Sequence, residues 1–267
     1  MAVAAHAAVP ERIPAVVFED VLDPDASHVQ GACCSDDAVY LTQRTALYKF
    51  GWDGKLLAKV AVTNHTGDIC FHDGKVYTSV CLYNCENRGR IQVFDGKDLS
   101  FVHESPGFPR PADGIAYVDG VFYVGLGSNH PKPPEPHLVN WVCRFDAKTL
   151  RPLEEKRDFI YGHRTSYGVQ DIATDGQRLF IAFYAVKGSP AVVVTDTDWN
   201  ILQKVDGFTA SNGLDLLPKR LRGDRLRFFK VTTSRPPRRD NPSKKGFGAS
   251  LTFYEFKDGS FIDITAK

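Results

Sequence analysis

The 267-residue sequence has one methionine, three tryptophans and no long apolar segment. No run approaches the roughly 20 apolar residues that a membrane-spanning helix needs, so we expect a soluble protein with no membrane partner. No window keeps apolar residues at a 3.6-residue spacing, which predicts almost no helix. The alanine-rich start lacks the charged and apolar regions of an intact signal peptide. We expect residues 1–12 to form an irregular extension of a single domain covering residues 1–267.

Cysteine is sparse, and its spacing matches no familiar framework. The six residues fit neither a zinc ribbon nor a dense disulfide scaffold, and they lie at Cys33, Cys34, Cys70, Cys81, Cys85 and Cys143. Cys81 and Cys85 could pair if the protein is exported to the periplasm or secreted, and free buried thiols are the alternative. A chain of this length buries enough surface to fold without a disulfide or a metal.

Charge is nearly balanced overall but uneven along the chain. The formal net charge is +1, yet residues 219–245 hold eleven Lys and Arg against two Asp. Such a stretch could attract an acidic polysaccharide, and a solvated face is the plainer alternative. Few aromatic residues alternate with the basic ones, so a nucleic-acid partner is not expected.

One short pattern, a small or polar pair followed by an apolar strand start, returns five times. The copies are His28-Val-Gln-Gly-Ala, His65-Thr-Gly-Asp-Ile, Pro111-Ala-Asp-Gly-Ile, Gly168-Val-Gln-Asp-Ile and Ala210-Ser-Asn-Gly-Leu. Their apolar residues are 37 to 57 positions apart, close to the 40–50 residues of a propeller blade.

Tight turns and alternating strands follow the copies. Asp73-Gly74 and Asp119-Gly120 separate β-branched and aromatic runs, which is the strongest local signal for a hairpin. A third strand and an outer strand complete each unit. The sequence therefore predicts an all-β, five-bladed β-propeller of four-stranded antiparallel blades. The remaining N-terminal strand, near residues 15–19, should complete the last blade and close the ring.

The aligned copies should bring polar side chains together at the central axis, since the innermost strands of a propeller converge there. Carboxylate and amide oxygens suit calcium, the first metal to test, and histidines keep zinc and manganese as candidates. We assign metal binding to Asp68, Asp113 and Asn212, catalysis to His28, His65, His163 and Asp171, and substrate binding to Gln30, Gln170 and Tyr167. The alternative is that these are turn residues around a water-filled channel.

Two segments resemble those of known metal-binding propellers. Ser211-Asn-Gly-Leu-Asp resembles the segment that supplies an asparagine ligand to calcium in gluconolactonase and senescence-marker-type propellers, and Asp113-Gly-Ile resembles their aspartate segment. The resemblance implies that Asn212 and Asp113 bind a metal. Those families have six blades and place the asparagine segment first, so the similarity is at the level of the superfamily.

Three functions follow from this cluster. The leading hypothesis is a monomeric, metal-assisted hydrolase or lyase acting on a small-molecule or oligosaccharide substrate derived from sugar, with an acidic substrate among the possibilities. The second is a non-catalytic propeller that binds a glycan or a protein. The third is a carboxylate-only glycosidase like those on other five-bladed propellers, using Asp68, Asp113 and Asp171. No glutamate occupies an aligned inner position, so a matched acid and base are not evident.

Overall fold

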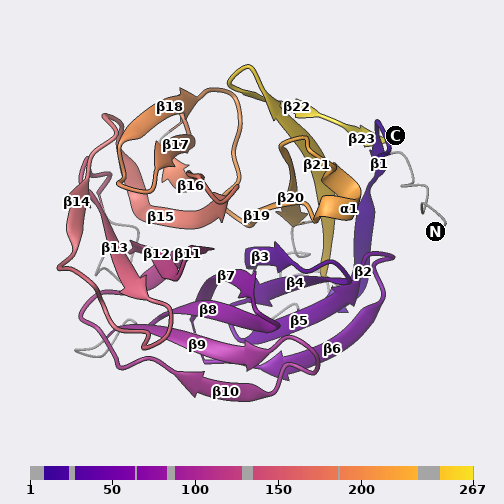
Figure 1. The fold of residues 1–267 in the computed structure, drawn as a ribbon, viewed down its shortest axis with the longest axis horizontal. Helices are drawn as coiled ribbons and strands as arrows, with labels where there is room; N and C mark the ends of the chain where they lie inside the picture. Colours follow the sequence, from indigo (N-terminus) through magenta and orange to yellow (C-terminus); the bar gives the residue numbers. More distant parts are fainter. Residues whose placement is uncertain are drawn as a thin grey trace, which may run out of the picture.

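The computed structural model describes residues 9–23, 28–63, 65–82, 88–127, 135–185, 187–233 and 247–266, and the side chains of residues 19, 20 and 247 are left aside. Its strands form five antiparallel sheets around a central axis (Figure 1). The prediction of a five-bladed propeller is confirmed. The only helix in the described ranges is α1 (Lys219–Arg222). None there is long and apolar enough to cross a membrane.

Blades one to four each run from an inner to an outer strand in chain order. Blade one contains β3 (Val29–Cys34), β4 (Ala38–Gln43), β5 (Ala46–Gly51) and β6 (Leu56–Ala61). Blade two contains β7 (Thr66–His72), β8 (Lys75–Cys81), β9 (Gly89–Asp95) and β10 (Phe101–Glu104). Blade three contains β11 (Ala112–Val118), β12 (Val121–Leu126), β13 (Asn140–Asp146) and β14 (Arg157–Phe159). Blade four contains β15 (Thr165–Thr174), β16 (Arg178–Ala185), β17 (Val192–Asp196) and β18 (Ile201–Val205).

Blade five joins the two ends of the chain. It contains β19 (Leu214–Leu216), β20 (Arg227–Thr233), β21 (Phe247–Lys257) and, as predicted, the N-terminal strand β2 (Val16–Leu22). A further strand, β22 (Ser260–Asp263), pairs with β21. β1 (Ile13–Pro14) and β23 (Thr265–Ala266) form a short parallel pair. The blade therefore holds the ring closed by hydrogen bonds between the N-terminal and C-terminal parts of the chain.

The hairpin turns have the backbone that the Asp-Gly sequences predicted. Asp73 and Gly74 have φ of 46° and 71°, and Asp119 and Gly120 have φ of 45° and 85°. Positive φ at both central residues is the geometry of a type I′ turn, whose twist matches that of the flanking strands.

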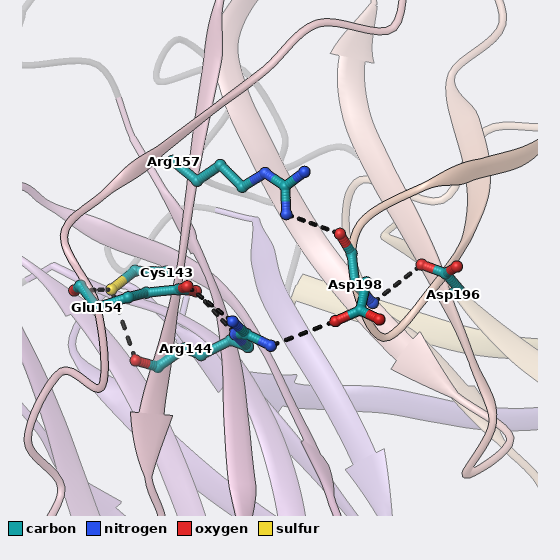
Figure 2. A network of polar contacts seen from close by, with 6 residues as sticks. All are labelled: Cys143, Arg144, Glu154, Arg157, Asp196 and Asp198. Atoms are coloured by element: carbon teal, nitrogen blue, oxygen red, sulfur yellow. Dashed lines mark hydrogen bonds and ion pairs between the residues drawn. The ribbon is translucent and has the colours of Figure 1, made fainter.

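The hydrophobic core is divided into five clusters, each lying between two neighbouring blades. Between blades three and four, for example, Val142 packs in the same buried cluster as Ile172 and Ile181. Polar contacts reinforce this boundary at its rim (Figure 2): Arg144 reaches both Glu154 and Asp198, and Arg157 donates to the Asp198 carbonyl oxygen at 2.8 Å. Each blade is thus held mainly by its neighbours.

Candidate functional site

The inner strands are joined at the axis by buried carboxylates. Oδ2 of Asp68, on β7 of blade two, accepts hydrogen bonds from the backbone N–H of Ile115 and Ile172, both at 3.0 Å. These donors belong to blades three and four. Gly31 of blade one also lies very close to Asp68. A Cβ at Gly31 would lie 2.3 Å from the Asp68 Cα atom, so only glycine allows the two inner strands to approach this closely.

Two more aspartates continue the same ring. Oδ1 of Asp171 accepts from Leu214 N at 3.0 Å, which joins blades four and five, and Oδ2 of Asp215 accepts from Cys34 N at 3.0 Å, which joins blades five and one. Thr42 Oγ1 donates to Gly67 O at 2.6 Å between blades one and two. Together these bonds connect all five blades at the axis.

Burial raises the pKa of both Asp68 and Asp171 well above the ordinary range, and their carboxyl groups also interact with each other. The nearby Asp68 charge is the second cause of the raised pKa of Asp171. Oδ1 of Asp68 and Oδ2 of Asp171 are buried and accept no hydrogen bond from the other described residues. Two buried, interacting carboxyl groups cannot both ionise readily, which favours a proton shared between them.

The inner strands of blades one to four each contain a β-bulge, close to the aligned apolar residue of the repeated pattern. The register shifts between Val29 and Gly31, between Thr66 and Ile69, between Ala112 and Ile115, and in β15 around Val169. A bulge releases backbone groups from the blade ladder. Here Ile115 and Ile172 turn their freed N–H groups toward Asp68, which explains why the sequence pattern repeats at this point.

A group of hydrogen-bonded polar side chains lies where inner strands begin and second strands end. His28 Nε2 lies 3.1 Å from the Tyr184 hydroxyl and 3.3 Å from Gln30 Nε2. Burial lowers the pKa of His28, so its ring is neutral at pH 7. An unprotonated Nε2 of His28 has one lone pair, which can accept from the Tyr184 hydroxyl or be shared with the longer contact from the Gln30 amide nitrogen. Three residues from blades one and four therefore form one hydrogen-bonded group.

His65, Cys81 and Asp113 form the one cluster of three metal-ligating side chains found among the described residues. One potential ligand atom from each lies within 4.8 Å of the other two. His65 precedes β7 and Cys81 ends β8, and they face each other through backbone bonds from Cys81 N to His65 O at 2.8 Å and from His65 N to Cys81 O at 3.3 Å. Asp113 comes from β11 of the next blade. The cluster therefore spans the boundary between blades two and three.

The electrostatics of this cluster suit a bound cation. Burial, assisted by Arg44 and His28, lowers the pKa of His65 to about 4, which leaves its ring neutral and able to ligate. Burial alone raises the pKa of Asp113 to about 7, and its side chain is only 9% exposed. Among the described residues no hydrogen bond to its carboxylate is found, so burial favours either its protonation or a nearby positive charge.

Gly127 makes room for that carboxylate. A Cβ at this position would lie 2.3 Å from Oδ2 of Asp113. Gly127 itself is fixed at the end of β12 by its N–H, which donates to Pro111 O at 2.9 Å. The absence of a side chain there allows the Asp113 carboxylate to lie directly against the backbone of Gly127.

The other predicted site residues lie around this centre or away from it. Tyr167 packs edge-to-face on Tyr184 with ring centroids 5.3 Å apart. Gln170 Nε2 donates to the Val169 carbonyl at 3.3 Å, and His163 packs on Tyr161. Asn212 lines a separate pocket in blade five with Lys230. The structure thus groups His28 with Gln30 and groups His65 with Asp113, while Asp68 and Asp171 lie in the axial carboxylate ring.

The structure adds Cys81, Tyr184 and Lys230, which sequence reasoning left out of the site. Cys81 and Tyr184 lie at the ends of β8 and β16, the second strands of their blades. In an antiparallel hairpin the end of the second strand returns beside the start of the first. Pairing each inner-strand start with the end of the following strand would have found both residues. The proposed Cys81–Cys85 pair involves Cys85, which lies outside the described residues.

Three internal segments with several polar residues also lie outside the described residues. These are residues 83–87, residues 128–134 and residues 234–246, the last of which includes the end of the basic stretch. The described part of the basic stretch makes contacts within the chain: Arg227 is fully buried and binds Glu255, and Arg220 lies over the Trp52 ring at 5.3 Å.

No known protein family and no curated relative matches this sequence. Among solved structures, glutaminyl cyclase of Myxococcus xanthus matches 92% of this chain and 97% of its own, with a TM-score of 0.60 and 9% identity. Xyloglucan PUL GH43B of Bacteroides ovatus matches 92% of this chain with a TM-score of 0.59 and 13% identity. That match spans 57% of the Bacteroides chain.

Identities this low show a shared fold alone. Both named proteins are enzymes, and their similarity covers nearly all of the chain described above. Because a propeller hosts many unrelated chemistries, function has to be argued from the site. The chain is a five-bladed β-propeller, closed by its N-terminal strand, that shares its fold with a glutaminyl cyclase and a GH43 glycosidase.

Proposed function

We propose that this protein is a metal-assisted hydrolase or lyase whose cation is held by His65, Cys81 and Asp113. The observation that carries the proposal is the convergence of a neutral imidazole, a thiol and a buried carboxylate within 4.8 Å. Catalytic zinc sites combine three protein ligands of these types with one open position for water or substrate. Sulfur and nitrogen ligands favour zinc over calcium, which takes oxygen ligands almost exclusively.

A zinc ion at this position would polarise a carbonyl oxygen or lower the pKa of a bound water toward neutrality. His28 and Tyr184 are the adjacent groups suited to proton transfer. Burial, followed by the nearby Asp113 and Tyr167, raises the pKa of Tyr184 to about 12, so its hydroxyl stays protonated and can donate. Neutral His28 can accept that proton through the 3.1 Å contact.

A sugar-derived substrate suits the surrounding side chains. Tyr167 and Tyr184 offer aromatic faces, and Gln30 offers an amide beside His28. Apolar ring faces combined with a few placed polar groups are typical of small-molecule pockets. A carboxylate-only glycosidase is less well supported, because Asp68 and Asp171 are almost fully buried and one oxygen of each binds backbone N–H groups of neighbouring blades.

The proposal predicts that activity depends on zinc and on Cys81. A panel of sugar lactones and glycosides is to be assayed with the native protein, with chelator, and after zinc is restored. We expect chelator to abolish activity and zinc to restore it. Cys81→Ser should lower kcat/KM by at least about a hundredfold, as loss of a metal ligand commonly does.

Cys143→Ser is the matched control, because Cys143 is also a buried thiol but lies in blade three with its Sγ 3.4 Å from Glu154 O. It should retain both zinc and activity. Full activity in chelator, or an active Cys81→Ser variant, would contradict the proposed metal-assisted chemistry.

A further inference from the structure

A second pocket lies in blade five, at the start of its inner strand. It has a volume of about 160 Å³ and is lined mostly by hydroxyl, amide and ammonium groups; its residues are Thr209, Ala210, Ser211, Asn212, Lys230, Val231, Thr232 and Thr233. Whole small-molecule sites usually measure about 300–1,000 Å³, so this pocket is the size of a subsite that holds one functional group.

Lys230 is the one ionisable residue among the described residues that line this pocket. Its ammonium group lies over the rings of Phe208 and Tyr254, 5.1 and 5.6 Å from their centroids. Burial lowers the pKa of Lys230, and Asp263 acts on it only as a weaker, opposing influence. Among the described residues Lys230 makes no ion pair. A half-buried cation held by aromatic faces and lacking a carboxylate partner favours an anion as its ligand.

The neighbours of Lys230 fit the same ligand. Hydroxyl groups of Ser211 and Thr232 and the amide of Asn212 can donate hydrogen bonds, and no carboxylate lines the pocket. The ammonium group makes this an unfavourable place for a divalent cation. Asn212 therefore lies better placed to bind an anionic oxygen than to share the metal with Asp113.

The pocket adjoins the axial site through β3 and β20. Thr233, which lines the pocket, accepts a hydrogen bond from Val29 N through Oγ1 at 3.3 Å. Val29 stands between His28 and Gln30, whose side chains form the group with Tyr184. In Figure 1, β3, β19 and β20 lie next to one another near the centre of the ring. The Lys230 pocket and the His28–Tyr184 group are therefore separated by a single pair of neighbouring strands.

We infer that the Lys230 pocket binds the carboxylate of the substrate, so that the substrate class is a sugar acid. This inference rests on the proposed function for the location of the reacting group, but the anion pocket itself is independent of the metal. One ammonium group with hydroxyl and amide donors matches a monoanionic carboxylate. A phosphate dianion would leave one charge unmatched, and phosphate sites more often use the bidentate geometry of arginine.

The test is calorimetric binding of glucuronate, glucose and glucose 6-phosphate to the full-length protein, in a buffer free of phosphate and carboxylate. We expect glucuronate to bind about tenfold or more tightly than glucose, since a charge-assisted hydrogen bond is lost with the neutral sugar. Lys230→Met keeps the apolar stem over Phe208 and Tyr254 and should abolish this difference. Asn212→Ala, a substitution in a half-buried turn, should reduce it and serves if Lys230→Met does not fold.

Lys59→Met is the matched control, because Lys59 makes the same kind of contact, 5.2 Å from the Tyr48 ring centroid, on the outer strand of blade one. It should leave the preference for glucuronate unchanged. Equal binding of glucuronate and glucose would overturn the inference, and so would a preference for glucuronate that survives in Lys230→Met. Tighter binding of glucose 6-phosphate than of glucuronate would also overturn it and would make phosphate, rather than carboxylate, the group that the pocket binds. Repeating the titrations after chelation separates the two proposals, since the anion preference should persist without zinc.

Discussion

At the scale of single residues, glycine and aspartate alternate along the axis. The residue just before the aligned apolar position is Gly31, Asp68, Gly114, Asp171 and Gly213 in blades one to five. This alternation is visible in the sequence and indicates that these positions meet. The hydrogen bonds from neighbouring blades to Asp68 and Asp171 depend on the β-bulges. The alternation of inward and outward side chains along a strand does not reveal where a bulge lies. The sequence therefore predicted which residues gather at the axis better than it predicted what each one does.

The shared proton of Asp68 and Asp171 predicts an unusual dependence of stability on pH. Burial and the adjacent Asp68 raise the folded-state pKa of Asp171 above its unfolded value. The folded state then binds the proton more tightly, so this contribution to stability is fully present below about pH 4 and is lost as pH rises through the folded pKa.

Asp171→Asn mimics the protonated pair, because Oδ1 can still accept from Leu214 N and the new amide can donate to Asp68. The free energy of unfolding of the variant should gain on that of the native protein by about 1 kcal/mol or more between pH 5 and pH 8. Urea denaturation at pH 5, 6, 7 and 8 measures this. The exposed Asp37→Asn should parallel the native protein. A constant gap between native protein and Asp171→Asn across these pH values would show that no proton is shared.

At the scale of elements, the strands and their turns were the most predictable part of the molecule. Asp119-Gly120 and the alternating run after it specify a hairpin locally, without help from the rest of the fold. The positions of Cys81 and Tyr184 were harder to foresee, because they depend on which strand ends lie beside the starts of inner strands. His65 and Cys81 are sixteen positions apart but face each other across β7 and β8.

The closing strand β2 carries a prediction of its own. Phe18 and Leu22 are buried between blades five and one, and Val16 to Phe18 pair with Leu251 to Ala249. Deleting residues 1–22 exposes the edge of β21 and removes these side chains, which should cost more than about 5 kcal/mol, comparable with the whole stability of many domains.

We expect that variant to lose cooperative thermal unfolding and to aggregate, as followed by circular dichroism and light scattering. Deleting residues 1–8 alone should leave the melting temperature within a few degrees of the native value, because β1 begins at Ile13. A soluble 23–267 fragment with a native-like, cooperative transition would show that ring closure by β2 is dispensable.

At the scale of the whole molecule, the propeller brings together three polar groups from blades that are far apart in the sequence. The proposed zinc ligands come from blades two and three, the His28–Tyr184 pair from blades one and four, and the Lys230 pocket from blade five. Five small cores between blades, rather than one central core, leave the starts of the inner strands free to carry polar side chains. The sequence pattern predicted this architecture, but the cluster of His65, Cys81 and Asp113 emerged only once the blades were placed side by side.

X-ray absorption spectroscopy at the zinc edge, on protein loaded with one equivalent of zinc, tests the central claim most directly. The account predicts one sulfur ligand at about 2.3 Å with nitrogen and oxygen ligands at about 2.0–2.2 Å. In Cys81→Ser the sulfur contribution should disappear, while Cys143→Ser should give the native spectrum. A spectrum with only nitrogen and oxygen ligands in the native protein, or one unchanged by Cys81→Ser, would contradict a metal centre at His65, Cys81 and Asp113.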